Sequence, residues 1–116
     1  MKLITKEIQR KLDANLKLDE DKRKPHLKLF NPCGSGTWLI TEHNTETGLM
    51  FGLCDLGHGF VEFGYVSMEE IKNIRLPFGL TIERDKSFEP EMTLKEYQQK
   101  VEEKNGYGRQ SLMSVA

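Results

Sequence analysis

The sequence predicts an α+β fold: a roughly five-stranded, mostly antiparallel sheet packed by an N-terminal helix and a short helix at 68–74, plus a C-terminal helix. Two observations predict it. The middle of the chain alternates apolar and polar residues in short runs joined by turns, which favours an antiparallel meander. Apolar residues with helical spacing precede and follow that region. The 116 residues fit a single domain at 1–104, and we expect 105–116 to be a mobile C-terminal tail.

The first expected helix spans 5–18. Thr5 can cap its start, and an apolar stripe of Ile8, Leu12 and Leu16 falls at i, i+4 and i+8. Such a stripe is typical of a helix that packs on a sheet. A charged link with a proline then separates this helix from the first strand.

Five runs of alternating or β-branched residues predict the strands. They lie at 26–30, 37–43, 49–53, 60–66 and 80–85. Alternation within these runs places most of the aromatic side chains in the core.

Two capping boxes mark the later helices. Ser67 and Glu70 open the short helix, whose inward residues are expected to be Ile71 and Ile74. Thr93 and Glu96 open a helix that continues to about residue 104. We expect this last helix to pack alongside the sheet.

Charge is distributed unevenly along the chain, although the net charge is −1. Residues 1–28 hold nine basic and five acidic side chains, whereas residues 29–74 hold one basic and six acidic. An acidic sheet disfavours a phosphate backbone, which requires Lys and Arg, and favours a basic protein partner. Nucleic-acid binding through the basic N-terminal third, including Lys22, Arg23 and Lys24, remains an alternative.

Composition argues against secretion and membrane insertion. The two cysteines are too few for a disulfide framework, and no apolar run approaches the roughly 20 residues of a membrane span. The N-terminus has no signal-peptide core. We therefore expect a cytoplasmic protein with both thiols reduced, no membrane contact and no cofactor.

Cysteine and histidine chemistry has weak support. Cys33, His43, Cys54 and His58 lack the close pairs of a zinc site, so we assign no metal ligand. Cys33 lies in a glycine-rich turn, where a thiolate nucleophile or a backbone anion site is conceivable. A strand-joining turn with a buried thiol explains the same residues more simply.

The acidic residues of the expected strands are the main functional candidates. Glu83 and Asp85 share one face of the fifth expected strand. Glu42 ends the second expected strand, and Glu62 lies within the fourth. Together the four could hold a divalent cation, as in a metal-dependent nuclease or hydrolase. The alternative is a solvated sheet edge. With Trp38, which is either a core or a recognition residue, they form the expected binding surface.

Several ordered motifs resemble a known family. They are Phe30-Asn31-Pro32-Cys33-Gly34, Thr37-Trp38, Phe51-Gly52-Leu53, Glu62-Phe63-Gly64-Tyr65-Val66-Ser67, Pro77-Phe78-Gly79-Leu80 and Ile82-Glu83-Arg84-Asp85. The chain resembles small bacterial proteins of unknown function that are often encoded on plasmids, phages and other mobile elements. The resemblance covers about residues 1–90 and implies no catalytic residues.

The favoured interpretation is a non-enzymatic binding protein of a mobile genetic element. It would modulate a host defence or DNA-processing system through its acidic sheet surface and bind a protein partner there. The alternatives are the metal-dependent hydrolase that uses the acidic residues and the nucleic-acid binder that uses the basic N-terminal third.

Overall fold

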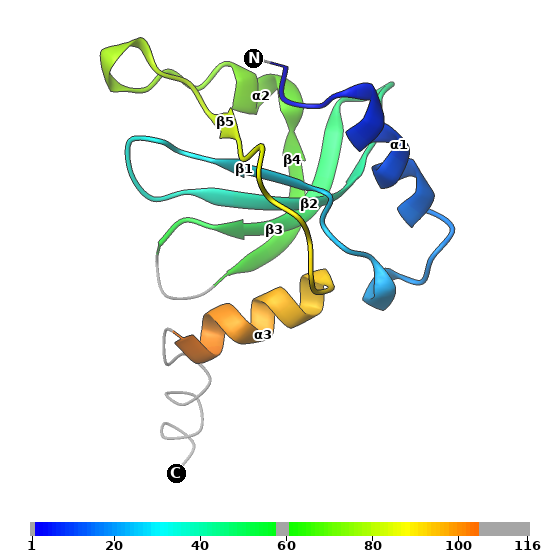
Figure 1. Ribbon diagram of the computed structural model, residues 1–116. Helices are drawn as coiled ribbons and strands as arrows, with labels where there is room; N and C mark the ends of the chain where they lie inside the picture. Colours follow the sequence, from blue (N-terminus) through cyan, green and yellow to red (C-terminus); the bar gives the residue numbers. More distant parts are fainter. Residues whose placement is uncertain (1, 58–60, 105–116) are drawn as a thin grey trace.

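The computed structural model describes residues 2–57 and 61–104 and contains one five-stranded antiparallel sheet (Figure 1). Its strands are β1 (Leu27–Phe30), β2 (Thr37–His43), β3 (Leu49–Asp55), β4 (Glu62–Ser67) and β5 (Glu83–Arg84). They lie in the order β4-β3-β2-β1-β5, and each neighbouring pair is antiparallel. The predicted α+β fold is thus confirmed.

Helix α1 (Lys6–Asn15) begins at the predicted cap, since the Thr5 hydroxyl accepts a hydrogen bond of 3.1 Å from the Ile8 amide. It ends three residues earlier than expected. Leu12 is fully buried, but Leu16 lies beyond the helix and is exposed. Asn15, and not Leu16, is the buried residue at the end of the helix. Its side chain is buried because it binds two backbone carbonyls.

One face of the sheet is covered by α1, by the N-terminal residues and by the short helix α2 (Met68–Lys72), as predicted for α1 and α2. Ser67 caps α2, and Ile71 is buried. The core on this face consists of Leu3, Ile4, Leu27, Leu29, Trp38, Ile40, Met50, Ile71 and Ile82. We call this side of the sheet the α1 face.

The opposite side, which we call the α3 face, is partly covered by α3 (Leu94–Lys104). Leu94 packs with Leu39, Leu53 and Val61 to form a second, smaller core. The predicted capping box is present, because the Thr93 amide donates to the Glu96 carboxylate and the Glu96 amide donates to the Thr93 hydroxyl. The helix also contacts the 3₁₀ turn η1 (Glu20–Lys22).

Placement of the aromatic residues in the core is wrong in part. Trp38 is buried, but Tyr65 is 71% exposed, Phe63 is 42% exposed and Phe78 is 95% exposed. Phe63 and Tyr65 lie on β4, at the edge of the sheet, where α3 leaves the surface open. Phe78 lies in the 3₁₀ turn η2 (Pro77–Gly79).

Among the predicted strands, the bounds of the last one change most, and two other predicted features lie outside the described residues. The last strand shortens to Glu83–Arg84, because residues 80–82, which follow η2, do not pair with β1. The expected start of the fourth strand at 60 and the tail at 105–116 fall among residues that the structure does not describe. No helix in the described ranges has the length and apolar character that crossing a bilayer requires.

Candidate protein-binding site

A β-bulge in β2 determines which side chains meet on the α3 face. Ile40 pairs with Gly52, and Glu42 then pairs with Phe51, so Thr41 is the extra residue. Without the bulge, strict alternation would place Glu42 on the α1 face with Ile40. The bulge therefore moves this carboxylate to the α3 face, beside Phe51.

Gly52 is required where β3 passes the bulge. A Cβ atom built on Gly52 would lie 1.9 Å from the Leu39 carbonyl oxygen and 2.9 Å from the Ile40 Cα. Both contacts are with backbone, which cannot move aside as a side chain would. The absence of a side chain at this position thus allows β2 and β3 to remain paired through the irregular register.

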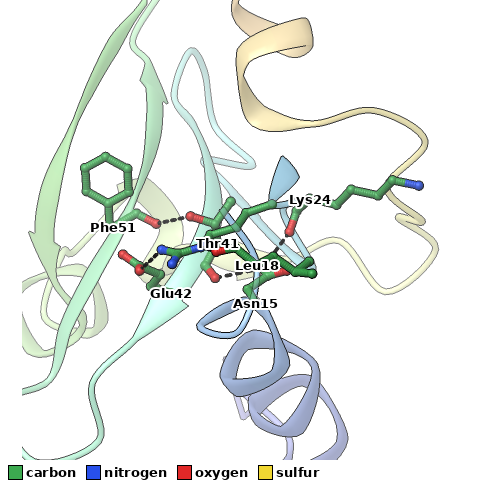
Figure 2. A network of polar contacts seen from close by, with 7 residues as sticks. Asn15, Leu18, Lys24, Thr41, Glu42 and Phe51 are labelled. Atoms are coloured by element: carbon green, nitrogen blue, oxygen red, sulfur yellow. Dashed lines mark hydrogen bonds and ion pairs between the residues drawn. The ribbon is translucent and has the colours of Figure 1, made fainter. Parts of the chain in front are cut away.

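A polar network links the bulge to the chain between α1 and β1 (Figure 2). The Asn15 amide nitrogen donates to the carbonyl oxygens of Lys24 and Thr41, each at 2.9 Å. The Thr41 hydroxyl donates to the Phe51 carbonyl at 3.4 Å. Because these partners come from α1, the link, β2 and β3, Asn15 and Thr41 hold four separate segments together.

Arg23 extends this network to α3. Its guanidinium forms an ion pair with Glu42, and its Nε donates to the Leu18 carbonyl at 3.0 Å. Its own carbonyl accepts from the Leu94 amide at 3.2 Å, at the start of α3. Both side chains of the ion pair are mostly buried, so the pair is shielded from solvent screening.

An open apolar depression lies over this ion pair, and we call it the aromatic groove. It is a pocket of about 310 Å³ on the α3 face. Phe51 and Tyr65 meet edge to face in its wall, with ring centroids 5.1 Å apart. Its lining consists of Glu20, Asp21, Arg23, Thr41, Glu42, Phe51, Phe63, Tyr65, Leu94, Lys95 and Gln98.

A second hollow of about 540 Å³ adjoins the aromatic groove. Glu42, Phe51 and Tyr65 line both, and exposed Leu16 and Leu49 lie at the far end of the second hollow. The two hollows therefore share an apolar centre, formed by Phe51 and Tyr65, among polar and charged side chains. Exposed apolar patches with a polar rim are typical of interaction surfaces.

The structure does not bring the four candidate carboxylates together. Glu42 lies on the α3 face of the central strand β2. Glu62 lies on the α1 face of β4, because it is opposite Cys54, which is opposite the α1-face residue Trp38. Glu83 and Asp85 lie at β5, on the other edge of the sheet. Within the described residues, no three His, Cys, Asp or Glu side chains are placed to hold a metal ion.

Two of the four candidate carboxylates form ion pairs with basic side chains that the structure describes. Glu42 pairs with Arg23, and Asp85 pairs with Lys28 at 3.6 Å. Trp38 is 9% exposed, so it contributes to the core much more than to any contact surface. Of the expected binding residues, Glu42 lines the aromatic groove, and Glu62 lines a smaller hollow on the other face of β4.

The cysteine expectations need one correction. Cys33 is exposed, because the turn after β1 carries it outward, and its sulfur lies 3.9 Å from the Pro77 carbonyl oxygen. Cys54 is partly buried. Burial, and secondarily Glu62 and Asp55, raise the pKa of the Cys54 thiol. His58 lies outside the described residues, so no Cys–His arrangement with it can be assessed.

His43 is packed between α1 and the sheet. Its Nδ1 lies 2.7 Å from the Gln9 side-chain oxygen, whereas its buried Nε2 has no hydrogen-bond partner among the described residues. Burial lowers the pKa of His43, although Asp13 partly offsets that effect. This histidine is therefore a neutral structural residue at physiological pH.

Sequence reasoning missed Arg23 and the exposed aromatics of the groove. Composition groups Arg23 with Lys22 and Lys24 as a phosphate contact, but its guanidinium binds Glu42 and the Leu18 carbonyl. The bulge that places Glu42 has no sequence signature apart from Gly52. The alternation at Phe63 and Tyr65 did indicate a shared face, but not that this face is open.

Comparison with known proteins places the chain in a family without assigning an activity. No curated protein and no solved structure matches it. A family described as "Protein of unknown function (DUF2958)" matches residues 3–107, which is nearly the whole chain. The match spans the sheet, all three α-helices and every residue of the aromatic groove. The chain belongs to this DUF2958 family.

Proposed function

We propose that this protein is a non-enzymatic binding module that holds a protein partner in the aromatic groove. The observation that carries the proposal is the exposure of Tyr65 and Phe63 beside a pocket on the face that α3 only partly covers. Aromatic side chains provide a large contact area at low conformational cost and are enriched at the centres of interfaces. Phe51, opposite Tyr65 on the neighbouring strand, packs against it edge to face. This contact holds the Tyr65 ring in position before a partner binds.

The rim of the groove indicates the charge of the partner. Glu42 and Arg23 neutralise each other, which leaves Glu20 and Asp21 against Lys95. A partner segment with both apolar and basic side chains fits this combination. Complementary charge of this kind mainly raises the association rate and selects among partners.

The proposal extends to the biological setting. We infer that the partner belongs to a host defence or DNA-processing system that a mobile genetic element encounters in the cytoplasm. The sequence resemblance to small proteins of mobile elements supports this part. A metal-dependent hydrolase and a nucleic-acid binder have less support, because the candidate carboxylates are dispersed and Arg23 is engaged by Glu42.

Site-specific photocrosslinking in the native host tests the proposal. A benzophenone amino acid replaces Tyr65 in the groove or, as the matched control, Glu7 on the exposed side of α1. We expect a discrete crosslinked protein from position 65 and not from position 7. Excess unlabelled wild-type protein should suppress the crosslink, whereas excess Tyr65→Ala should not. Crosslinking that is equal at both positions would refute a binding site in the groove.

A further inference from the structure

We propose that the partner contributes an extended, basic segment that pairs with β4 as a sixth strand of the sheet. This inference rests on the proposed binding function and specifies how the partner is held. It follows from three independent features of β4: its position in the sheet, the hollows on both of its faces, and the charge beside it. Peptides that add to a sheet edge obtain affinity from backbone hydrogen bonds and specificity from alternate side chains.

The two edges of the sheet differ in how they are protected. β5 is two residues long, and both of them, Glu83 and Arg84, are charged. Short, charged edges are a common way to prevent pairing with another chain. β4 is six residues long and contains Phe63, Tyr65 and Val66, and among residues 2–57 and 61–104 its one neighbour in the sheet is β3. Its edge therefore lacks the features that protect β5.

Both sides of β4 can accept side chains from an added strand. On the α3 face, Phe63 and Tyr65 form the wall of the aromatic groove. On the α1 face, a hollow of about 220 Å³ lies over the Gly52–Gly64 pair, where two neighbouring strands lack side chains. A Cβ built on Gly64 would meet no atom within 4 Å. Because strand side chains alternate, the residues of an added strand would lie in turn beside Phe63 and Tyr65 on the α3 face and beside the Gly64 hollow on the α1 face.

Charge indicates the chemistry of the added segment. Glu62 is exposed on the α1 face of β4, and no ion pair of this residue occurs within the described part of the chain. A Lys or Arg opposite Glu62 would form a favourable cross-strand pair. A second copy of this chain would instead bring another acidic β4 to the same edge. The charge therefore favours a basic segment over self-pairing, with apolar residues on the side of Phe63 and Tyr65.

Selection from a library of random nine-residue peptides displayed on phage tests this inference with the full chain as the target. We expect the enriched peptides to alternate basic and apolar residues with a period of two. One enriched peptide is then synthesised in two forms, with the odd or the even backbone amides N-methylated. A strand directs successive amides to opposite sides, so one form should bind at least tenfold more weakly while the other binds as the parent does.

Amide hydrogen exchange and two variants locate the bound peptide. Saturating peptide should slow exchange of alternate β4 amides, and Glu62→Lys should weaken binding at least fivefold. Tyr65→Ala tests the groove separately. A peptide could require Tyr65 for binding, tolerate both methylation patterns and leave the exchange of β4 amides unchanged. That result would overturn strand addition but would still support a binding site in the groove. If the peptide pairs with β4 and Tyr65→Ala does not weaken its binding, strand addition at β4 is supported and the groove is not the binding site.

Two further outcomes would also overturn strand addition. One is the failure of alternating peptides to be enriched. The other is a concentration-dependent dimer of the wild type, seen by analytical ultracentrifugation, whose formation slows exchange of alternate β4 amides. Such a dimer would identify a second copy as the occupant of the edge.

Discussion

Gly52 and Gly64 lie directly opposite each other on β3 and β4, yet only Gly52 lies where a side chain cannot fit. A Cβ on Gly52 would enter the backbone of the β2 bulge, at 1.9 Å from the Leu39 carbonyl oxygen. The corresponding position on Gly64 is open on the edge strand. The two glycines thus form a pair of nearly matched substitution sites.

We predict that Gly52→Ala lowers the free energy of unfolding by about 2–4 kcal/mol, because the backbone of β2 or β3 must shift to relieve the clash. Gly64→Ala should be neutral or stabilise by up to about 1 kcal/mol, since alanine restricts the unfolded chain more than glycine does. Urea unfolding followed by circular dichroism measures both. Equal effects at the two positions would show that the bulge does not require glycine.

The bulge also explains how much could be predicted from sequence. Alternation and turn residues predict all five strands and an antiparallel sheet, because each strand carries its own pattern, but they do not predict that β5 pairs with β1. A bulge changes the face of every later residue, and its position depends on a partner strand that the local pattern does not reveal. The face of Glu42 could therefore not be predicted, nor could its pairing with Arg23.

The burial of Asn15 could not be predicted from the sequence either. A polar residue in a helix expected to continue to residue 18 gives no sign of burial, but Asn15 is buried because its amide binds two carbonyls from distant segments. The exposure of Phe63 and Tyr65 depends on how much of the sheet helix α3 covers. That coverage is set by packing between elements. Patterns along one segment cannot provide such information.

The Arg23–Glu42 pair should contribute more to stability than a surface ion pair. We predict that Glu42→Gln lowers the free energy of unfolding by about 1–3 kcal/mol, because it leaves a mostly buried guanidinium without its counter-charge. Lys11 and Glu7 provide the control, as an exposed pair at 3.7 Å on α1. Its removal by Glu7→Gln should cost at most about 0.5 kcal/mol.

A double-mutant cycle with Arg23→Gln and Glu42→Gln isolates the interaction from the individual losses. We expect a coupling energy that changes little between 0.05 and 0.5 M salt, because the pair is shielded from ions. The Lys11–Glu7 coupling should be small and should disappear at high salt. A strongly salt-dependent Arg23–Glu42 coupling would indicate that the pair is solvated.

Stability should fall as the pH is lowered through the ordinary range of histidine. Burial lowers the pKa of His43, and burial, with Lys11 and Lys24, lowers the pKa of His26. The folded chain thus binds fewer protons than the unfolded chain, whose histidines have the ordinary pKa of 6.5. The free energy of unfolding therefore rises with pH in this range. The part that depends on these two histidines is fully present above about 6.5 and is lost as the pH falls towards their lowered pKa values.

Urea unfolding at pH 7.5 and 5.5 measures this dependence in a window above the ordinary pKa of carboxylates. The doubly substituted His26→Gln, His43→Gln protein should show a smaller difference between the two pH values than wild type. Greater stability of the wild type at pH 5.5 would contradict the lowered pKa of both histidines.

The two thiols should differ in reactivity. We predict that iodoacetamide at pH 8 modifies Cys33 at least ten times faster than Cys54. Cys33 is exposed, whereas burial and neighbouring carboxylates raise the pKa of Cys54 and reduce its thiolate fraction. Mass spectrometry of timed samples gives both rates. In Cys33→Ser only the slow phase should remain, and 8 M urea should bring the two rates together; a fast phase in that variant would disprove the assignment.

Phe78 combines strain with exposure. Its φ of 64° is in the left-handed region, which disfavours a bulky side chain, and its ring is 95% exposed. Asparagine tolerates this conformation, so Phe78→Asn should raise the free energy of unfolding by about 0.5–1 kcal/mol, since little packing is lost. The control is Leu80→Asn, at an exposed position with an ordinary φ of −80°, which should bring no gain.

Differential scanning calorimetry at pH 7.5 measures this change as a rise in the unfolding temperature of Phe78→Asn alone. A fall would contradict the assignment of strain to Phe78. A rise would show that the phenylalanine reduces stability at the tip of a turn whose ends are joined by the Leu76 amide and the Leu80 carbonyl, 2.9 Å apart. Strain that persists without benefit to the fold is characteristic of residues that contact another molecule.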